Sequence, residues 1–408
     1  MNTAINSGDT AWVLMSCALV LMMTPALALF YGGMARRKNI LSTLTLNYVF
    51  MALIGVQWIL FGYTLAFGPD IGGFIGGLHF LGFNGVGALP NPDYSKTIPH
   101  NLFAAFQMMF AVITPALITG AFVERVRFKS FLLFSLLWAT LVYDPLCHWV
   151  WGSGGWLARL GTLDFAGGTV VHIAAGFAAL AFALAIGPRK GFGKIPMEPH
   201  NIPLTVIGAG LLWVGWFGFN GGSALAANGV AVNALLATNT SAASAGLVWM
   251  LISWLDGRPS TLGLVTGMVV GLAAVTPAAG YITPMAGLVV GAVAAPIGYY
   301  GIRFRIRRNL DESMDVWPCH GMSSLWGMIA TGLFATTEVN PAGANGLFFG
   351  NPGQLAVQFL AIAVTIAFVF VVTFVMAKVL DMSIGLRVSP MEEEVGLDIS
   401  SHGERAYS

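Results

Sequence analysis

Charged side chains are scarce in this 408-residue sequence. Asp, Glu, Lys and Arg make up 9% of it, whereas about a quarter of a typical soluble domain is charged. Apolar residues make up 56%. This balance excludes a large soluble domain and indicates a polytopic protein of the lipid bilayer. The formal net charge of +1 argues against a nucleic-acid partner.

Cysteine is also rare, and familiar catalytic motifs are missing. Cys17, Cys147 and Cys319 fall in apolar segments without CxxC or zinc spacing, so we expect buried small side chains and no disulfide. The sequence has no HExxH, no GxSxG and no Gly-rich phosphate loop. We therefore expect no enzyme activity, no metal site and no cofactor.

Basic residues are absent from the start of the chain, since none precedes Arg36. The first apolar run therefore lacks the basic region of a signal peptide, and we interpret it as the first membrane span. The chain is predicted to be all-α, with eleven spans that mostly approach or exceed the ~20 residues needed to cross a bilayer. The predicted spans are 10–35, 40–67, 100–123, 130–151, 164–187, 201–222, 232–254, 262–277, 283–302, 316–336 and 354–383.

The distribution of basic residues predicts the orientation. Of the 19 Lys and Arg residues, only Lys96 and Arg159 lie outside the loops after spans 1, 3, 5, 7 and 9 and the tail. The positive-inside rule then places the N-terminus outside the cell and the C-terminus in the cytoplasm. An odd number of spans requires the two termini to lie on opposite sides, which agrees with this orientation.

An internal repeat is visible in the first and sixth spans. Leu29–Gly33 (LFYGG) and Trp216–Gly222 (WFGFNGG) both read as aromatic residues followed by two glycines. Five spans per half is an odd number, so the second half must be inverted, with the substrate path at the interface of the halves. We expect residues 1–383 to form the membrane domain, with halves at about 10–187 and 201–336, an extra helix at 354–383 and a tail at 384–408.

Two histidines lie inside apolar segments that correspond in the two halves. His172 follows Asp164 in the stretch DFAGGTVVH, and His320 follows Asp315 in DVWPCH. Ionisable residues inside a membrane are candidates for function. A neutral imidazole offers one donor and one acceptor, so one hypothesis is a pair of histidines in one pore. The alternative is two separate histidines bonded to the backbone.

The neighbouring acids have simpler interpretations. Asp164 and Asp315 are expected to cap spans 5 and 10, and Asp164 could also favour cations at the pore mouth. Asp144 and His148 are spaced i,i+4 and are expected to pair as a structural contact.

Aromatic residues are dense near the predicted outer face. Phe106–Phe110 lies early in span 3, Trp149–Gly152 ends span 4, and Phe219–Ser223 ends span 6. Any one of them fits an interfacial aromatic belt. Together they also suit a cation site, because a ring face attracts an ammonium-like ion by about 0.5–2 kcal/mol.

Taken together, these stretches resemble the ammonium transporter family, the group of ammonium transporters, methylammonium permeases and rhesus proteins. The resemblance runs over essentially the whole chain. The other stretches that carry it are Ala28–Gly33, Gly120–Arg125, Thr276–Tyr281 and, in the tail, Gly396–Tyr407.

The resemblance implies a fold, a site and a mechanism. Eleven helices would form an inverted repeat of five plus one helix, in a homotrimer with one pore per subunit. Ammonium would bind outside, lose its proton and pass as ammonia, with net movement of charge. By motif position, the implied residues are Phe110, Trp151 and Ser223 for the external site, Phe110 and Phe219 for the gate, His172 and His320 for the pore and proton relay, and Asp164 for structural support.

The resemblance leaves some points open. Trp317-Pro318-Cys319 departs from the small residues that usually precede the second histidine, and Pro318 is expected to kink span 10.

The tail reads as a solvated end by composition, whereas the resemblance suggests an ordered segment and a cytoplasmic PII-type signal protein as partner. An ammonium sensor of the same fold and a rhesus-type channel for neutral ammonia are the alternatives. The chain ends soon after the tail motif without an output domain, which favours transport over sensing.

Overall fold

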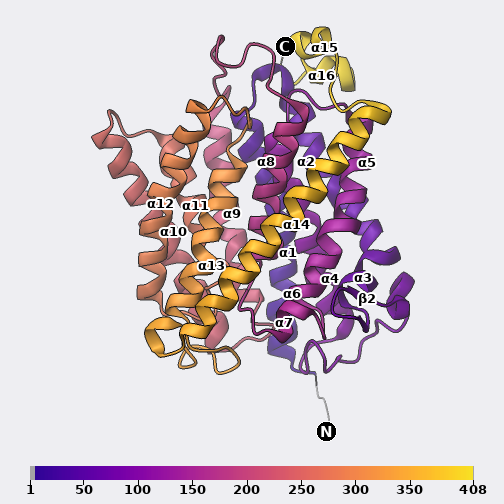
Figure 1. Cartoon of the computed structure of the whole chain (residues 1–408), viewed down its shortest axis with the longest axis vertical. Coiled ribbons are helices and arrows are strands. Elements are labelled where there is room, and N and C mark those ends of the chain that lie inside the picture. The colour runs from indigo at the N-terminus through magenta and orange to yellow at the C-terminus, as the bar shows by residue number, and fades with distance from the viewer. Residues whose placement is uncertain (1–4, 408) are drawn as a thin grey trace.

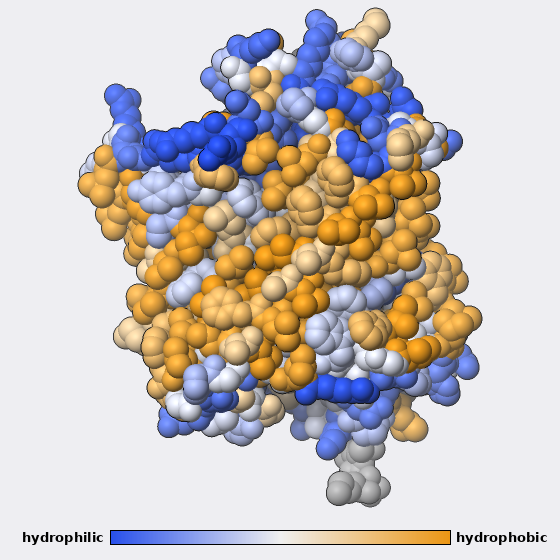
Figure 2. Space-filling model, viewed as in Figure 1, coloured by the Kyte–Doolittle hydropathy of each residue, from blue (hydrophilic) through white to orange (hydrophobic). Residues whose placement is uncertain are grey.

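The computed structural model describes residues 5–407, whose regular secondary structure is almost entirely helical. The long helices run side by side, with those of the first half gathered on one side of Figure 1 and those of the second half on the other. Figure 2 shows an apolar belt between two polar ends. Within the described residues, nine helices are long and apolar enough to cross a membrane, and α11 (Thr261–Val275) is a shorter apolar helix. The predicted all-α, polytopic membrane architecture is confirmed.

The first half holds the first five predicted spans. Its helices are α1 (Ser7–Met34), η1 (Arg37–Asn39), α2 (Ile40–Gln57), η2 (Trp58–Gly62), α3 (Tyr63–Phe67), η3 (Leu78–Phe83), α4 (His100–Ile118), η4 (Thr119–Ala121), α5 (Phe128–Trp138), η5 (Ala139–Tyr143), α6 (Asp144–Trp151), α7 (Trp156–Arg159), η6 (Gly168–Ile173) and α8 (Ala174–Ile186). Two short antiparallel strands, β1 (Asp70–Ile71) and β2 (Ile75–Gly76), pair in the loop after α3.

The second half holds predicted spans 6–10, and helix α14 (Pro352–Ile384) and the tail follow it. Their helices are α9 (Ile202–Gly222), α10 (Gly229–Leu255), α11, α12 (Pro284–Arg307), η7 (Trp317–Met322), α13 (Ser323–Phe334), η8 (Leu347–Phe349), α14, α15 (Pro390–Val395) and α16 (Leu397–His402). Each of the eleven predicted spans contains at least one of the helical segments of the two halves or α14. The long helix α14 crosses the others diagonally in Figure 1.

Four helical segments are π-helical: η2, η5, η6 and η7. Such wide turns are uncommon and occur often at functional sites. Two of them, η6 and η7, occupy corresponding positions in the halves and carry His172 and His320. The internal repeat is therefore visible in local geometry as well as in sequence.

Glycines allow the two halves to approach closely. A β-carbon at Gly176 in α8 would lie 2.4 Å from the Cα of Gly321 in η7, and one at Gly208 in α9 would lie 2.4 Å from the backbone N of Phe30 in α1. Neither position has room for a larger residue. Small residues let membrane helices pack backbone to backbone, and here they bring the histidine segments together.

The C-terminal tail is ordered and packs on the loops of its own chain. In α15, Ser389 and Glu392 form a capping box. Asp398 Oδ1 accepts a hydrogen bond from Ser42 N (2.8 Å), and Leu397 N donates to Asn39 Oδ1 (2.8 Å). The tail is thus not a freely solvated end. We call the end of the molecule that carries it the tail face, and the opposite end the vestibule face (Figure 1).

Candidate functional site

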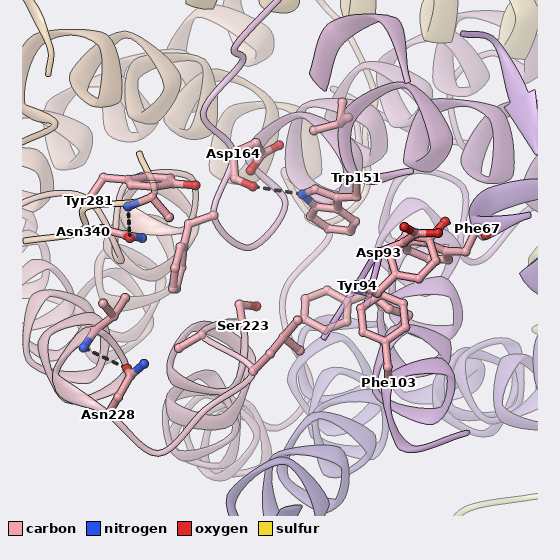
Figure 3. Close-up of a pocket in the computed structure, with 18 residues that line it drawn as sticks. Phe67, Asp93, Tyr94, Phe103, Trp151, Asp164, Ser223, Asn228, Tyr281 and Asn340 are labelled. Carbon is pink, nitrogen blue, oxygen red and sulfur yellow. Dashed lines mark hydrogen bonds between the residues drawn. The ribbon is translucent and has the colours of Figure 1, made fainter. Parts of the chain in front are cut away.

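A wide cavity of about 700 Å³ opens at the vestibule face. Phe110 is among its lining residues, as are Trp151, Asp164 and Ser223, which are labelled in Figure 3. Trp151 Nε1 donates to the backbone O of Asp164 (2.9 Å), and Ser223 Oγ donates to the backbone O of Phe219 (2.8 Å). Both side chains are therefore held in place, and the Ser223 oxygen keeps its capacity to accept a hydrogen bond.

Two phenylalanines close the bottom of this vestibule. The ring centroids of Phe110 and Phe219 are 4.4 Å apart with an interplanar angle of 47°, so the rings are tilted rather than stacked flat. Trp151 meets Phe110 edge-on, at 5.8 Å between ring centroids. Phe110 and Phe219 are both about 1% exposed, so a solute can pass only if a ring moves.

The two histidines lie beyond the phenylalanines and contact each other. The Nδ1 atoms of His172 and His320 are 3.3 Å apart, and the rings are nearly parallel at 15°, with centroids 5.3 Å apart. Because a neutral imidazole has one N–H, one ring must donate and the other accept. Trp216 also stacks on His172, at 5.3 Å between ring centroids and 20°, and is fixed by its own hydrogen bond to Thr276 (2.9 Å).

The space around the pair is narrow and apolar. His172, His320, Phe219 and Trp216 line a cavity of only ≈ 10 Å³ together with aliphatic side chains. That is about the minimum volume for one water molecule. Among the described residues, the Nε2 atom of His172 has no hydrogen-bond partner. It is therefore available to a small polar solute.

Asp164 anchors the segment that carries His172. Its carboxylate accepts hydrogen bonds from the backbone N of Gly167 (2.8 Å), Gly168 (2.6 Å) and Thr169 (2.7 Å), and from the Thr169 hydroxyl. These are the free N–H groups at the start of η6. Asp164 thus acts as the expected cap, although Gly167, with φ of 113°, occupies the residue position just before the helix.

A second cavity, of about 230 Å³, lies towards the tail face. His320 and Cys319 line it together with Tyr31 and Asp315. His320 therefore lines both this exit cavity and the narrow cavity beside His172. All three cysteines are free.

Two predicted roles near His320 are wrong. The Asp315 side chain does not cap span 10; it is bonded by Arg305, with Nε at 2.7 Å. The capping acid is Glu312, whose Oε1 accepts from Trp317 N at 2.8 Å. Pro318 does not kink the middle of the span, because it lies in the first turn of η7, where a missing N–H costs nothing.

The expected pairing of Asp144 with His148 is also wrong. Asp144 Oδ2 accepts from Gln57 Nε2 at 2.7 Å, where the π-helical segments of spans 2 and 4 meet. The Nε2 atom of His148 lies 3.0 Å from Oδ1 of Asp70 in β1, and its Nδ1 lies 2.9 Å from the backbone O of Ala66. Both residues are fully buried, which fits the structural role expected of them.

A buried ion-pair cluster joins the loops under the exit cavity. Arg189 contacts both Asp311 (2.8 Å) and Glu124 (3.1 Å), and Glu124 also pairs with Arg36 (2.7 Å). Burial would raise the pKa of Glu124, but Arg189 and Arg36 hold that pKa below its usual value. The same balance, with Arg189 and Arg125 as partners, lowers the pKa of Asp311. The cluster thus keeps its carboxylates charged and ties four loops together near the tail face.

Comparisons with known proteins identify the family. The family model for the Ammonium Transporter Family matches residues 11–407. The ammonium transporter Amt1 of Archaeoglobus fulgidus is 52% identical over 99% of this chain and 100% of that protein, and the ammonium transporter of Bacillus subtilis is 50% identical over 98% of each. This chain belongs to the ammonium transporter family, as the sequence motifs predicted.

Solved structures share the fold. The crystal structure of Candida albicans Mep2 has a TM-score of 0.91 at 36% identity, covering 99% of this chain and 91% of that one. A protein described as a sensor Amt protein has a TM-score of 0.90 at 28% identity, covering 97% of this chain and 98% of that one. The fold therefore accommodates proteins described as sensors, and the fold alone does not separate sensing from transport.

Proposed function

We propose that this protein carries ammonium across the cell membrane with net movement of charge. The observation that carries the proposal is the contact between His172 and His320 in a narrow apolar passage. Family membership supports ammonium as the substrate. The site contains no other pair of titratable side chains in contact along this passage among its described lining residues.

Recruitment takes place in the vestibule. The faces of Phe110 and Trp151 and the oxygen of Ser223 surround a space suited to a small cation. Cation–π attraction contributes about 0.5–2 kcal/mol per ring. Asp164 supports this site indirectly, by holding Trp151 through its backbone oxygen.

The proton and the ammonia then move separately. Carrying an intact ion through an apolar passage is costly, whereas neutral ammonia can cross it once a ring of the Phe110–Phe219 gate has moved. His172 and His320 accept and pass on the proton, because an imidazole can take a proton at one nitrogen and release one from the other. Net charge movement follows when ammonia and the proton reach the same side.

The vestibule face is assigned to the outside of the cell and the tail face to the cytoplasm. The support is the positive-inside rule, since nearly all Lys and Arg residues lie at the tail face. As in the family to which the chain belongs, we propose a homotrimer with one pore per subunit in the plasma or inner membrane. The ordered tail and the loops under it form the surface where a PII-type signal protein would bind.

The test is charge movement in proteoliposomes after an ammonium pulse. The full-length chain is expected to give a sustained, saturable current. His172→Leu and His320→Leu should each abolish or strongly alter it, with Cys147→Ala, a buried residue outside the pore, as the matched control. An unchanged current in both histidine variants would contradict the relay.

The same vesicles separate the alternatives. Ammonium binding without sustained current, together with ammonia flux measured as an internal pH change, would support a rhesus-type channel. Binding with neither current nor flux would support a sensor. The sensor alternative is included in this test because one structurally similar protein is described as a sensor protein.

A further inference from the structure

Glu312 lies in the loop between α12 and η7, just before the segment that carries His320. Its side chain is 1% exposed. One carboxyl oxygen, Oε1, accepts a hydrogen bond from Trp317 N at 2.8 Å, which caps the first turn of η7. The other, Oε2, is buried and has no hydrogen-bond partner within residues 5–407.

The loop around Glu312 is held firmly on its other sides. Met314 N donates to the backbone O of Gly120 (2.8 Å), and Asp311 is bonded by Arg189. Arg125 donates to the backbone O of Asp311 (2.7 Å) and to Ser313 Oγ (2.9 Å). Glu312 is therefore the one acid of this loop whose carboxylate the surrounding donors do not fully satisfy.

The charged and titratable groups that face Glu312 come from three helices and its own loop. Arg305 of α12 is the nearest cation, but its guanidinium is bonded to Asp315 and to the backbone O of Leu310. Asp315 is a like charge in the same loop. Tyr31 of α1 and Cys319 of η7 are also within electrostatic range of Glu312, and both line the exit cavity with His320.

We propose that protonated Glu312 is a positioning residue for the pore: it fixes the start of the His320 segment, and loss of its proton on the cytoplasmic side slows transport. The inference rests on the proposed function and orientation. A carboxylate at Glu312 would be a buried charge with one unpaired oxygen. It would compete with Asp315 for Arg305, and the turn that holds His320 against His172 would shift.

The proton is exchanged in a physiological range. Burial raises the pKa of Glu312 to about 8; Arg305 and the backbone N–H groups of Trp317 and Val316 oppose this rise, and Asp315 adds to it. At pH 7 most molecules then carry the proton, and one pH unit above the pKa only about a tenth do. If only the protonated form is well positioned, the current falls by up to about tenfold between internal pH 6.5 and 9.

The decisive comparison uses Glu312→Gln in proteoliposomes at fixed external pH and varied internal pH. Glutamine keeps an acceptor for Trp317 N but cannot lose a proton. The matched control is Glu198→Gln, an exposed acid in another tail-face loop. Because internal pH also changes the driving force, the quantity measured is the current of Glu312→Gln divided by that of Glu198→Gln.

This ratio should be near one at internal pH 6.5, about two at pH 8 and roughly ten at pH 9, because it is the inverse of the protonated fraction of Glu312. A ratio that stays constant would overturn the proposal. So would a ratio that falls, because it would mean that the charged form of Glu312 positions the pore better.

A second readout does not depend on transport. Infrared spectra of protein labelled with ¹³C at glutamate side chains should show one protonated carboxyl band that disappears near pH 8 in the wild type. Asp144 stays unlabelled, and the lowered pKa of Glu124 places its titration elsewhere. Absence of this band would overturn the proposal even if Glu312→Gln failed to fold. A wild type that shows the band but no current at any pH would instead contradict the proposed function.

Discussion

The two histidine segments are built on the same plan but anchored differently. In each half a buried acid accepts hydrogen bonds from the first turn of a π-helical stretch, Asp164 for η6 and Glu312 for η7. Asp164 receives three backbone N–H groups and one hydroxyl. Glu312 receives Trp317 N on one oxygen, and its other oxygen has no partner among the described residues. The difference indicates that the vestibule-side anchor is static, whereas the tail-side anchor depends on its proton.

The largest expected effect comes from changing the carboxylate of Asp164 to an amide. In Asp164→Asn, one carboxylate oxygen is replaced by an NH₂ group. This group is a donor, so the N–H groups that the oxygen had accepted from lose their acceptor. Each buried donor left unpaired costs about 1–3 kcal/mol, so we expect a current at least about 100-fold lower and a lower melting temperature in detergent. The same carboxyl-to-amide change at Glu312 should alter the current less than about twofold at internal pH 6.5. Equal losses in the two variants would remove the distinction between the anchors.

The next largest effect is expected where the two segments touch. Gly176→Ala places a β-carbon 2.4 Å from the Cα of Gly321, and overpacking of this kind costs about 1–3 kcal/mol. We expect a lower melting temperature and a reduced current, because η7 must move away from α8. Gly210→Ala is the matched control, since a β-carbon there meets no atom within 4 Å. Equal melting temperatures for the two variants would show that the contact does not constrain the segments.

A third prediction concerns stability and pH. The pKa of Glu312 is raised from 4.5 to about 8 in the folded protein, so the folded state holds a proton that the unfolded chain has released. Stability from this group is therefore lost as the pH rises from about 4.5 to 8. The melting temperature of the wild type should fall across this range relative to Glu312→Gln and run parallel to it above pH 8. Parallel curves at all pH values would place the titration of Glu312 outside this range.

The smallest expected effect lies at the mouth of the vestibule. Asp93 is an exposed acid that lines the large cavity, and its charge should raise the local concentration of cations. Asp93→Asn should lower the current by less than about threefold at 10 mM salt and leave it unchanged at high salt, where such fields are screened. Glu338→Gln removes an exposed acid at the same face, outside the cavity lining, and should have a smaller effect than Asp93→Asn at 10 mM salt. A loss that persists at high salt would indicate a direct contact instead.

The parts of the fold and site that depend on apolar patterning could be predicted from the sequence. The spans followed from long runs without charge, and His172 and His320 stood out because ionisable residues are rare in such runs. The sequence pointed to Asp315 as the cap of span 10, whereas the cap in the structure is Glu312. That choice depends on a loop in which Asn309 and Asp315 adopt left-handed backbone conformations (φ of 54° and 58°), which neither residue type requires.

Side-chain partners that lie far apart in the chain were the other feature that could not be predicted from the sequence. The i,i+4 spacing of Asp144 and His148 predicted a local pair, yet Gln57 and Asp70 are the actual partners. Spacing along one helix shows which residues share a face, but not which side chains the neighbouring elements present. The only sequence signal was indirect: Gln57 is a polar residue within an apolar run, as is its partner Asp144.

The cavity beside the histidine pair limits how many solute molecules the passage can hold at one time. A space of ≈ 10 Å³ leaves no place for a second solute to wait, although the vestibule outside holds about 700 Å³. Crowding the entrance therefore cannot shorten the time each molecule spends inside. Under the proposed mechanism, single occupancy would set a maximum transport rate, and an amine that enters but leaves slowly would block the passage of the molecules behind it.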